Sequence, residues 1–280
     1  MSTTWHGDMP PVPTPVGVSG ALRATIKILP LGCIVFGGLL LMLLLRCVER
    51  PIWGQSRPLT PYITVAVCKT ALAILRIRLV VHGRPLRGRG AVVANHSSWL
   101  DIFVLNASKR IYFVSKAEVA GWPGIGWLAR ATGTVFIERN RSKAAEQARL
   151  FEYRLRAGHK LLFFPEGTSS DGARVLPFKS TLFAPFYSPN LREALVVQPA
   201  SVFYVAPMGA DQRFYGWWGD MEFGSHFLRV LAQKGTGTVK VTYHPPLAVS
   251  DFVDRKALAE TCEDTVRRGW NAAASPTFSQ

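Results

Sequence analysis

The most constraining feature of the sequence is an uncharged apolar run, Ile28–Leu45, which reads ILPLGCIVFGGLLLMLLL and lies between two basic residues. Its 18 residues approach the roughly 20 that a helix needs to cross a bilayer, so the run predicts membrane insertion. Pro30 and the pair Gly37-Gly38 can kink or divide such a helix, which leaves a short transmembrane helix and a re-entrant hairpin both open. A cleaved signal peptide fits less well, because a long stretch precedes the run.

The charge balance agrees with a membrane protein. The chain has 33 Lys and Arg against 18 Asp and Glu, a net charge of +15, yet only 18% of its residues are charged. An excess of positive charge on a hydrophobic chain indicates attraction to an anionic surface, either nucleic acid or lipid headgroups. Basic clusters at 84–89 and 139–143 come without a recognised nucleic-acid-binding motif, so we expect no nucleic acid and an anionic membrane surface as partner.

Basic residues flanking the apolar run indicate its orientation. Arg46, Arg50 and Arg57 follow the run, whereas Arg23 and Lys27 precede it, so the positive-inside rule puts the rest of the chain on the cytoplasmic side. The four cysteines show no CxxC spacing and predict neither a disulfide nor a zinc framework. We therefore expect an inner-membrane protein whose catalytic domain faces the cytosol.

The chain divides into two parts. Residues 1–57 form an N-terminal tail and membrane segment, and residues 58–280 form one catalytic domain. An amphipathic helix near residues 60–78 opens this domain and lies either in the membrane interface or against the core. After it, short β-like runs alternate with helical ones, which predicts an α/β fold with a mixed or parallel sheet flanked by helices. The predicted strands are 92–94, 111–115, 134–137, 161–164, 196–203 and 239–243; the predicted helices start near Ser98 and span 142–156 and 251–270, the last capped by Ser250 or Asp251.

The first candidate catalytic group is the segment Asn95–Asp101 (NHSSWLD), placed where a strand gives way to a helix. The spacing of His96 and Asp101 lets a carboxylate in the first helical turn fold back toward the imidazole and fix its tautomer, so that His96 acts as a general base. No G-x-S-x-G elbow is present, so the nucleophile would be a substrate hydroxyl. A purely structural role is also open, because Ser98 and Asp101 are spaced as in a helix N-cap.

A second group, Pro165–Gly172 (PEGTSSDG), directly follows the buried-type strand KLLFF. Ligands of open α/β sheets bind beyond the carboxyl ends of the strands, where this segment lies. Between the two groups, Gly133–Arg139 reads as a strand that ends on a guanidinium, which suits a phosphate. Each pattern alone has an ordinary explanation, whereas the three together in this order indicate one active site.

The series N-H-x4-D, G-x-(I/V)-F-I-x-R, F-P-E-G-T and a late apolar strand with proline resembles the four sequence blocks of the 1-acylglycerol-3-phosphate acyltransferase family. The resemblance covers about residues 80–245. It implies that His96 takes the proton of a lysolipid hydroxyl, whose oxygen attacks the thioester of acyl carrier protein or coenzyme A. Asp101 would orient His96 and stabilise its charged form, with neither a metal nor a covalent acyl-enzyme. The resemblance further implies acceptor-binding roles for Lys116, Arg139, Glu166, Gly167 and Thr168.

One departure from the family pattern bears on the acceptor. The family's third block usually continues E-G-T-R, whereas this chain has Ser169 there, with Arg174 and Lys179 further on. This variant is similar to the branch of bacterial lyso-ornithine lipid acyltransferases, whose acceptor carries an amino-acid headgroup. The expected acceptor is 1-acyl-sn-glycerol-3-phosphate, because Arg139 and Lys116 remain. Lyso-ornithine lipid is the alternative, and one chain acting on both is also open.

Two other classes of function compete with the acyltransferase reading. A non-catalytic membrane-interaction protein could keep the same fold, although an intact His96 and Asp101 pair argues against it. A lipid hydrolase could use the same base on water, but an acyltransferase must exclude water from the thioester. A non-catalytic protein would form no acylated product. A hydrolase would transfer the acyl group to water and not to a lysolipid hydroxyl.

Overall fold

The computed structural model describes residues 4–11, 15–138 and 143–275. Its centre is one eight-stranded sheet in the order β1-β7-β6-β2-β5-β3-β4, with β8 paired to β6. The strands are β1 (Ile77–Gly83), β2 (Gly90–Ala94), β3 (Tyr112–Lys116), β4 (Val135–Ile137), β5 (Lys160–Phe163), β6 (Val196–Val205), β7 (Gly237–Tyr243) and β8 (Leu247–Ala248).

Strand direction brings the candidate residues to one edge. Strands β6, β2, β5, β3 and β4 are successively parallel, whereas β7 and β8 run antiparallel to β6. The mixed sheet flanked by helices that the sequence predicted is thereby confirmed. Because β2 and β5 are parallel neighbours, the segments that follow them, with His96 and Glu166, emerge side by side.

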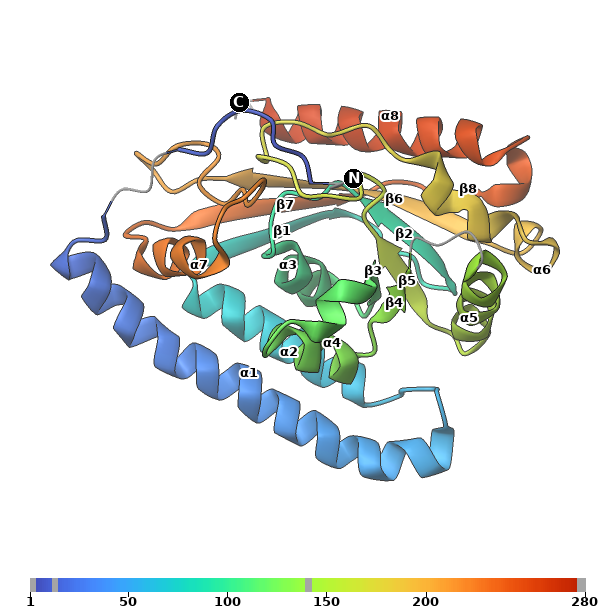
Figure 1. The fold of residues 1–280 in the computed structure, drawn as a ribbon, viewed down its shortest axis with the longest axis horizontal. Helices are drawn as coiled ribbons and strands as arrows, with labels where there is room; N and C mark the ends of the chain where they lie inside the picture. The colour runs from blue at the N-terminus through green and yellow to red at the C-terminus, as the bar shows by residue number, and fades with distance from the viewer. Residues whose placement is uncertain (1–3, 12–14, 139–142, 276–280) are drawn as a thin grey trace.

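Helices cover both faces of the sheet and enclose two hydrophobic cores. Figure 1 shows α8 along one face, and α2, α3 and α7 on the other, with α1 outermost. One core joins the sheet to α1, α2, α3 and α7, and the other joins it to α5, α8 and the short 3-10 helix η3 (Ser180–Tyr187). The helices are α1 (Val18–Trp53), α2 (Thr60–Ile74), α3 (Asp101–Ser108), α4 (Ile125–Thr132), α5 (Ala144–Arg156), α6 (Pro189–Arg192), α7 (Phe223–Ala232) and α8 (Arg255–Ala274), with further 3-10 turns η1 (Ala117–Gly121) and η4 (Val249–Asp251).

The apolar run lies inside one continuous helix of 36 residues, α1, which passes through Pro30. Only 17% of its most apolar 18-residue window is buried, so α1 is not an ordinary core helix, and it is long and apolar enough to cross a membrane. Gly38 lets α2 approach closely, because a Cβ there would come within 2.4 Å of Val67 Cγ2. Gly38 thus packs the two helices together, and α1 continues through the glycine pair without a break.

Both ends of α1 are tied to the rest of the fold. Near its start, Arg23 Nε donates to the carbonyl of Ala232 at 2.9 Å. Near its end, the buried Glu49 accepts the backbone N–H groups of Leu59 and Thr60 at 2.8 and 3.2 Å. These amides lie at the start of α2 and have no acceptor within that helix. α1 therefore lies along the domain and presents its opposite, apolar face outward (Figure 1).

Several predicted boundaries differ from the structure. The helix expected near 60–78 ends at Ile74, because Arg76 adopts a left-handed conformation (φ 57°) and the chain continues as β1. The helix expected near Ser98 begins at Asp101, since the preceding residues form a turn. The terminal helix is capped by Asp254, whose Oδ1 accepts two first-turn N–H groups, and not by Ser250 or Asp251.

Candidate active site

His96 and Asp101 form a hydrogen-bonded pair at the carboxyl end of β2. His96 Nδ1 lies 2.7 Å from Asp101 Oδ2, with the imidazole 20% exposed and the carboxylate fully buried. Because an ionised carboxylate can only accept, Nδ1 carries the ring proton and Nε2 is left as the proton acceptor. The predicted base and its orienting carboxylate are therefore in contact, in the arrangement that general base chemistry requires.

Asp101 is held by more donors than the sequence indicated. Its Oδ2 also accepts the backbone N–H groups of Ser97 and Ser98 at 2.8 and 3.1 Å. Its Oδ1 accepts the hydroxyl of Tyr204, on the neighbouring strand β6, at 2.7 Å. The carboxylate therefore caps the turn and orients the histidine at once, so the two roles considered for Asp101 coexist.

Tyr204 is the functional candidate that sequence reasoning missed. It is buried, and burial together with the neighbouring Asp101 carboxylate raises the pKa of its phenol well above the usual range. The hydroxyl is thus a permanent donor to Asp101 at physiological pH. The available signal was a tyrosine in a buried strand, since buried tyrosines place their hydroxyl on a partner.

His96 and the turn that carries it are held by further contacts. Its ring stacks on Phe164, with centroids 4.0 Å apart, and its backbone carbonyl accepts Ser170 N at 2.9 Å. In the same turn, Trp99 donates its indole N–H to His226 Nδ1 at 2.9 Å, which joins the turn to α7. The pair of His96 and Asp101 is therefore supported by the loop after β5, by β6 and by α7.

Glu166 belongs to the loop that follows β5, and its side chain is buried. The side chain is 1% exposed, its Oε1 accepts Leu176 N at 3.3 Å, and its Oε2 has no hydrogen-bond partner among the described residues. Burial raises the pKa of this carboxyl well above its usual range. The buried carboxyl supports the loop from within, and its contact with an acceptor stays a prediction.

Gly167 and Thr168 form the turn of this loop. Gly167 has φ 71°, a left-handed conformation that favours glycine, and its N–H donates to the carbonyl of Phe164 at 3.0 Å. Thr168 is half-buried, and its hydroxyl oxygen accepts the backbone N–H of Trp5, from the N-terminal tail, at 3.2 Å. The loop thus turns beside His96, and Trp5 of the N-terminal tail contacts it there.

We expect acid to destabilise the protein through His226. The side chain is 2% exposed, and burial, followed by the charge of Arg229, lowers its pKa to about 4. In the unfolded chain the imidazole protonates at about pH 6.5, so the unfolded state takes up the proton first and the free energy of unfolding falls by up to about 1.4 kcal/mol per pH unit between these values. The thermal midpoint of His226→Gln should fall less from pH 7 to pH 5 than that of the wild type.

The comparison must be made between variant and wild type, because Glu166 acts in the opposite sense. Its raised pKa gives stability that is present at low pH and is lost as the pH rises. His82→Gln, at an exposed position, is the matched control, and its thermal midpoint should fall between pH 7 and pH 5 as much as that of the wild type. An equal fall in the wild type and in His226→Gln would contradict the assignment of this acid sensitivity to His226.

Comparisons with known proteins agree with this geometry. The family model "Acyltransferase" matches residues 78–203. Over 265 residues the chain is 54% identical to a lyso-ornithine lipid O-acyltransferase of Rhodobacter capsulatus, covering 95% of this chain and 96% of that protein. The chain belongs to the 1-acylglycerol-3-phosphate acyltransferase family. It is also 33% identical over 216 residues to a 1-acyl-sn-glycerol-3-phosphate acyltransferase of Neisseria gonorrhoeae, covering 72% and 78% of the two chains.

The fold of this acyltransferase agrees with a solved member. The crystal structure of the 1-acyl-sn-glycerophosphate acyltransferase PlsC from Thermotoga maritima superimposes with a TM-score of 0.67. The match covers 93% of this chain and 97% of that one at 23% sequence identity, and it concerns the fold alone. The acyltransferase class predicted from the sequence blocks is confirmed by the family model and by the identity to the Rhodobacter capsulatus protein.

Of the remaining predicted binding residues, Lys116, Ser169 and Arg174 follow or end strands of the sheet and are described by the structure. Lys116 is half-buried at the carboxyl end of β3. Arg139 lies outside the described residues, two positions after the end of β4. Ser169 is half-buried in the loop after β5, where the family pattern has arginine, and Arg174 closes that loop with an ion pair to Asp171 at 2.9 Å.

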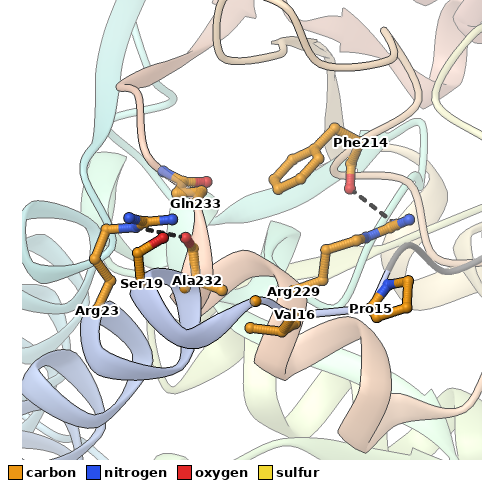
Figure 2. Close-up of a pocket in the computed structure, with 10 residues that line it drawn as sticks. Pro15, Val16, Ser19, Arg23, Phe214, Arg229, Ala232 and Gln233 are labelled. Carbon is orange, nitrogen blue, oxygen red and sulfur yellow. Dashed lines mark hydrogen bonds between the residues drawn. The ribbon is translucent and has the colours of Figure 1, made fainter.

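A cavity of about 220 Å³ lies elsewhere, between the start of α1 and the end of α7. Figure 2 shows Arg23 and Arg229 in its wall, each donating to a backbone carbonyl, Ala232 and Phe214 respectively. Both guanidinium groups are therefore hydrogen-bonded to backbone carbonyls, and the cavity lies between α1 and α7. Among the described residues, no group of three or more His, Cys, Asp or Glu side chains is arranged to hold a metal ion.

Proposed function

We propose that this acyltransferase moves a fatty acyl group from a thioester, of acyl carrier protein or coenzyme A, to the free 3-hydroxyl of lyso-ornithine lipid. The observation that carries the reaction class is the pair of His96 Nδ1 and Asp101 Oδ2, 2.7 Å apart at the carboxyl edge of the sheet. The acceptor is favoured by the 54% identity to a protein named for that activity over almost the whole of both chains.

The chemistry follows from the tautomer that Asp101 holds. His96 Nε2 takes the proton of the acceptor hydroxyl as its oxygen bonds to the thioester carbonyl carbon. The imidazolium is stabilised by the buried carboxylate while the tetrahedral intermediate forms. When the intermediate collapses, the C–S bond breaks and His96 returns its proton to the leaving thiolate. The products are an ester and a free thiol, and the base is regenerated.

The third sequence block supports an acceptor without a phosphate. Ser169 replaces the arginine of the family pattern, which removes a cation suited to bidentate phosphate binding. Arg174 supplies a guanidinium in the same loop. Of the two acceptors expected from the sequence, lyso-ornithine lipid is therefore preferred, and 1-acyl-sn-glycerol-3-phosphate becomes the alternative.

We also propose that the enzyme works on the cytosolic face of the inner membrane. α1 presents an exposed apolar face that includes Leu22, Leu29, Phe36, Leu40 and Leu44, while both its ends are tied to the domain. A helix that lies along the domain in this way holds the sheet edge close to the bilayer. Basic residues at the opening would add about 1 kcal/mol each in attraction to anionic headgroups. The acceptor then enters from the bilayer and the thioester from the water.

The proposal is tested by a product assay on detergent-solubilised protein with one labelled acyl donor and either lyso-ornithine lipid or lysophosphatidate. We expect wild-type product with lyso-ornithine lipid and its loss in His96→Ala. Product from lysophosphatidate alone would reassign the acceptor and make Arg174 the next residue to change. No product that depends on His96 from either acceptor would contradict the proposed function.

A further inference from the structure

The N-terminal tail lies across the loop that turns beside His96. Residues 4–11, called the strap below, reach this loop although α1 begins far away: the dark blue trace of the strap runs above the sheet in Figure 1, and α1 starts at the left edge. Trp5 N donates to Thr168 Oγ1 at 3.2 Å, and Trp218 Nε1 donates to the carbonyl of Asp8 at 3.0 Å. The strap is thus held at two points by backbone atoms.

The strap also places the carboxylate of Asp8 on Arg174. Asp8 Oδ2 lies 2.5 Å from Arg174 Nη2, and the ring of Trp5 lies under the guanidinium, 5.4 Å from its carbon to the ring centroid. Arg174 also contacts Asp171 at 2.9 Å. Asp171 is fully buried and fixes the guanidinium, whereas Asp8 is 63% exposed and is the carboxylate that can be exchanged.

Arg174 belongs to a loop that is hydrogen-bonded to the backbone of His96. Ser170 Oγ contacts both the carbonyl of Arg174, at 3.3 Å, and the carbonyl of His96, at 3.2 Å. Gly172 packs on Ser97, since a Cβ there would lie 3.5 Å from the serine Cβ. One short loop therefore connects the guanidinium to the catalytic histidine.

The occupant of Arg174 has the chemistry of the proposed acceptor. An amino acid acylated on its α-nitrogen keeps a free α-carboxylate, and a guanidinium binds a carboxylate through paired, charge-assisted hydrogen bonds. An exposed ion pair such as that of Asp8 contributes little to stability, so an incoming carboxylate can replace it.

We propose that Arg174 binds the headgroup carboxylate of the acceptor, and that Asp8 of the strap occupies this position until the acceptor displaces it. The inference rests on the proposed function, because it requires an acceptor with an amino-acid headgroup. It assigns the strap a role in acceptor binding and gives the enzyme a cation for the headgroup in place of the missing arginine at position 169.

The test compares lyso-ornithine lipid with its methyl ester, which lacks the carboxylate charge, in detergent micelles. With the acid, Arg174→Gln should raise the KM about tenfold, which corresponds to the loss of one charged hydrogen bond. Asp8→Asn should lower the same KM about threefold, because the competing carboxylate is gone. With the ester, the wild-type KM should already be about tenfold higher, and neither variant should change it.

Asp220→Asn is the matched control, because this exposed carboxylate also contacts the strap, at His6, and not Arg174. It should leave both KM values at the wild-type level. Equal use of acid and ester by the wild type, or a KM for the acid that rises in Asp8→Asn, would overturn the inference while the proposed function stands. Absence of wild-type turnover with either lipid would overturn the proposed acceptor and this inference with it.

Discussion

His96→Ala should lower product formation by at least about 10²-fold while the protein stays folded and bound to membranes. The loss follows from the proposed mechanism, in which His96 Nε2 takes the proton from the acceptor hydroxyl. The fold should survive, because Asp101 keeps its hydrogen bonds to Ser97 N, Ser98 N and the hydroxyl of Tyr204. The measurement is the initial rate with a labelled thioester, alongside flotation of the variant with vesicles.

His82→Ala serves as the control for this prediction, since His82 is exposed on β1, away from the carboxyl end of β2. It should keep the wild-type rate. A His96→Ala variant that retains turnover would exclude the general-base mechanism. A variant that loses both turnover and vesicle binding would point to misfolding, and His96→Gln, which keeps a polar side chain over Phe164, would then replace it.

The sequence was sufficient to predict that the segments carrying His96 and Glu166 emerge at one edge of the sheet. Each follows a short apolar strand, and parallel neighbours in an α/β sheet deliver their carboxyl ends to one edge. The contact between His96 and Asp101 was predictable for a local reason, because both lie in one turn. The same locality explains why capping and orientation could not be separated from the sequence: one carboxylate performs both.

The contacts that the sequence did not predict are those between distant segments. Tyr204 lies 103 positions from Asp101, and Asp8 lies 166 positions from Arg174. No periodicity or spacing links such residues, since their meeting depends on how β6 pairs with β2 and on where the tail docks. The early end of α2 has a local cause of another kind, a left-handed arginine, which is a conformation that arginine rarely adopts.

The second large effect is expected from Tyr204→Phe, which removes one hydroxyl from a buried ring. Asp101 Oδ1 loses the donor at 2.7 Å, so the carboxylate is freer to rotate away from His96 Nδ1. Hydrogen bonds to charged groups contribute about 1.5–3 kcal/mol, so losing half of that free energy in the transition state should lower kcat by about 3- to 13-fold. The KM for the acceptor should not change, because Tyr204 is buried beneath the pair.

Tyr215→Phe is the control that separates catalysis from packing in this prediction. Its ring lies 5.5 Å from that of Tyr204, it is equally buried, and its hydroxyl donates to Gln233 and not to Asp101. Both variants should lose thermal stability, by about 1–3 kcal/mol each, because each leaves a buried acceptor without its donor. Only Tyr204→Phe should lose kcat. If the two variants lost kcat equally, the hydroxyl of Tyr204 would matter for packing, and the orientation of Asp101 would rest on the amides of Ser97 and Ser98 alone.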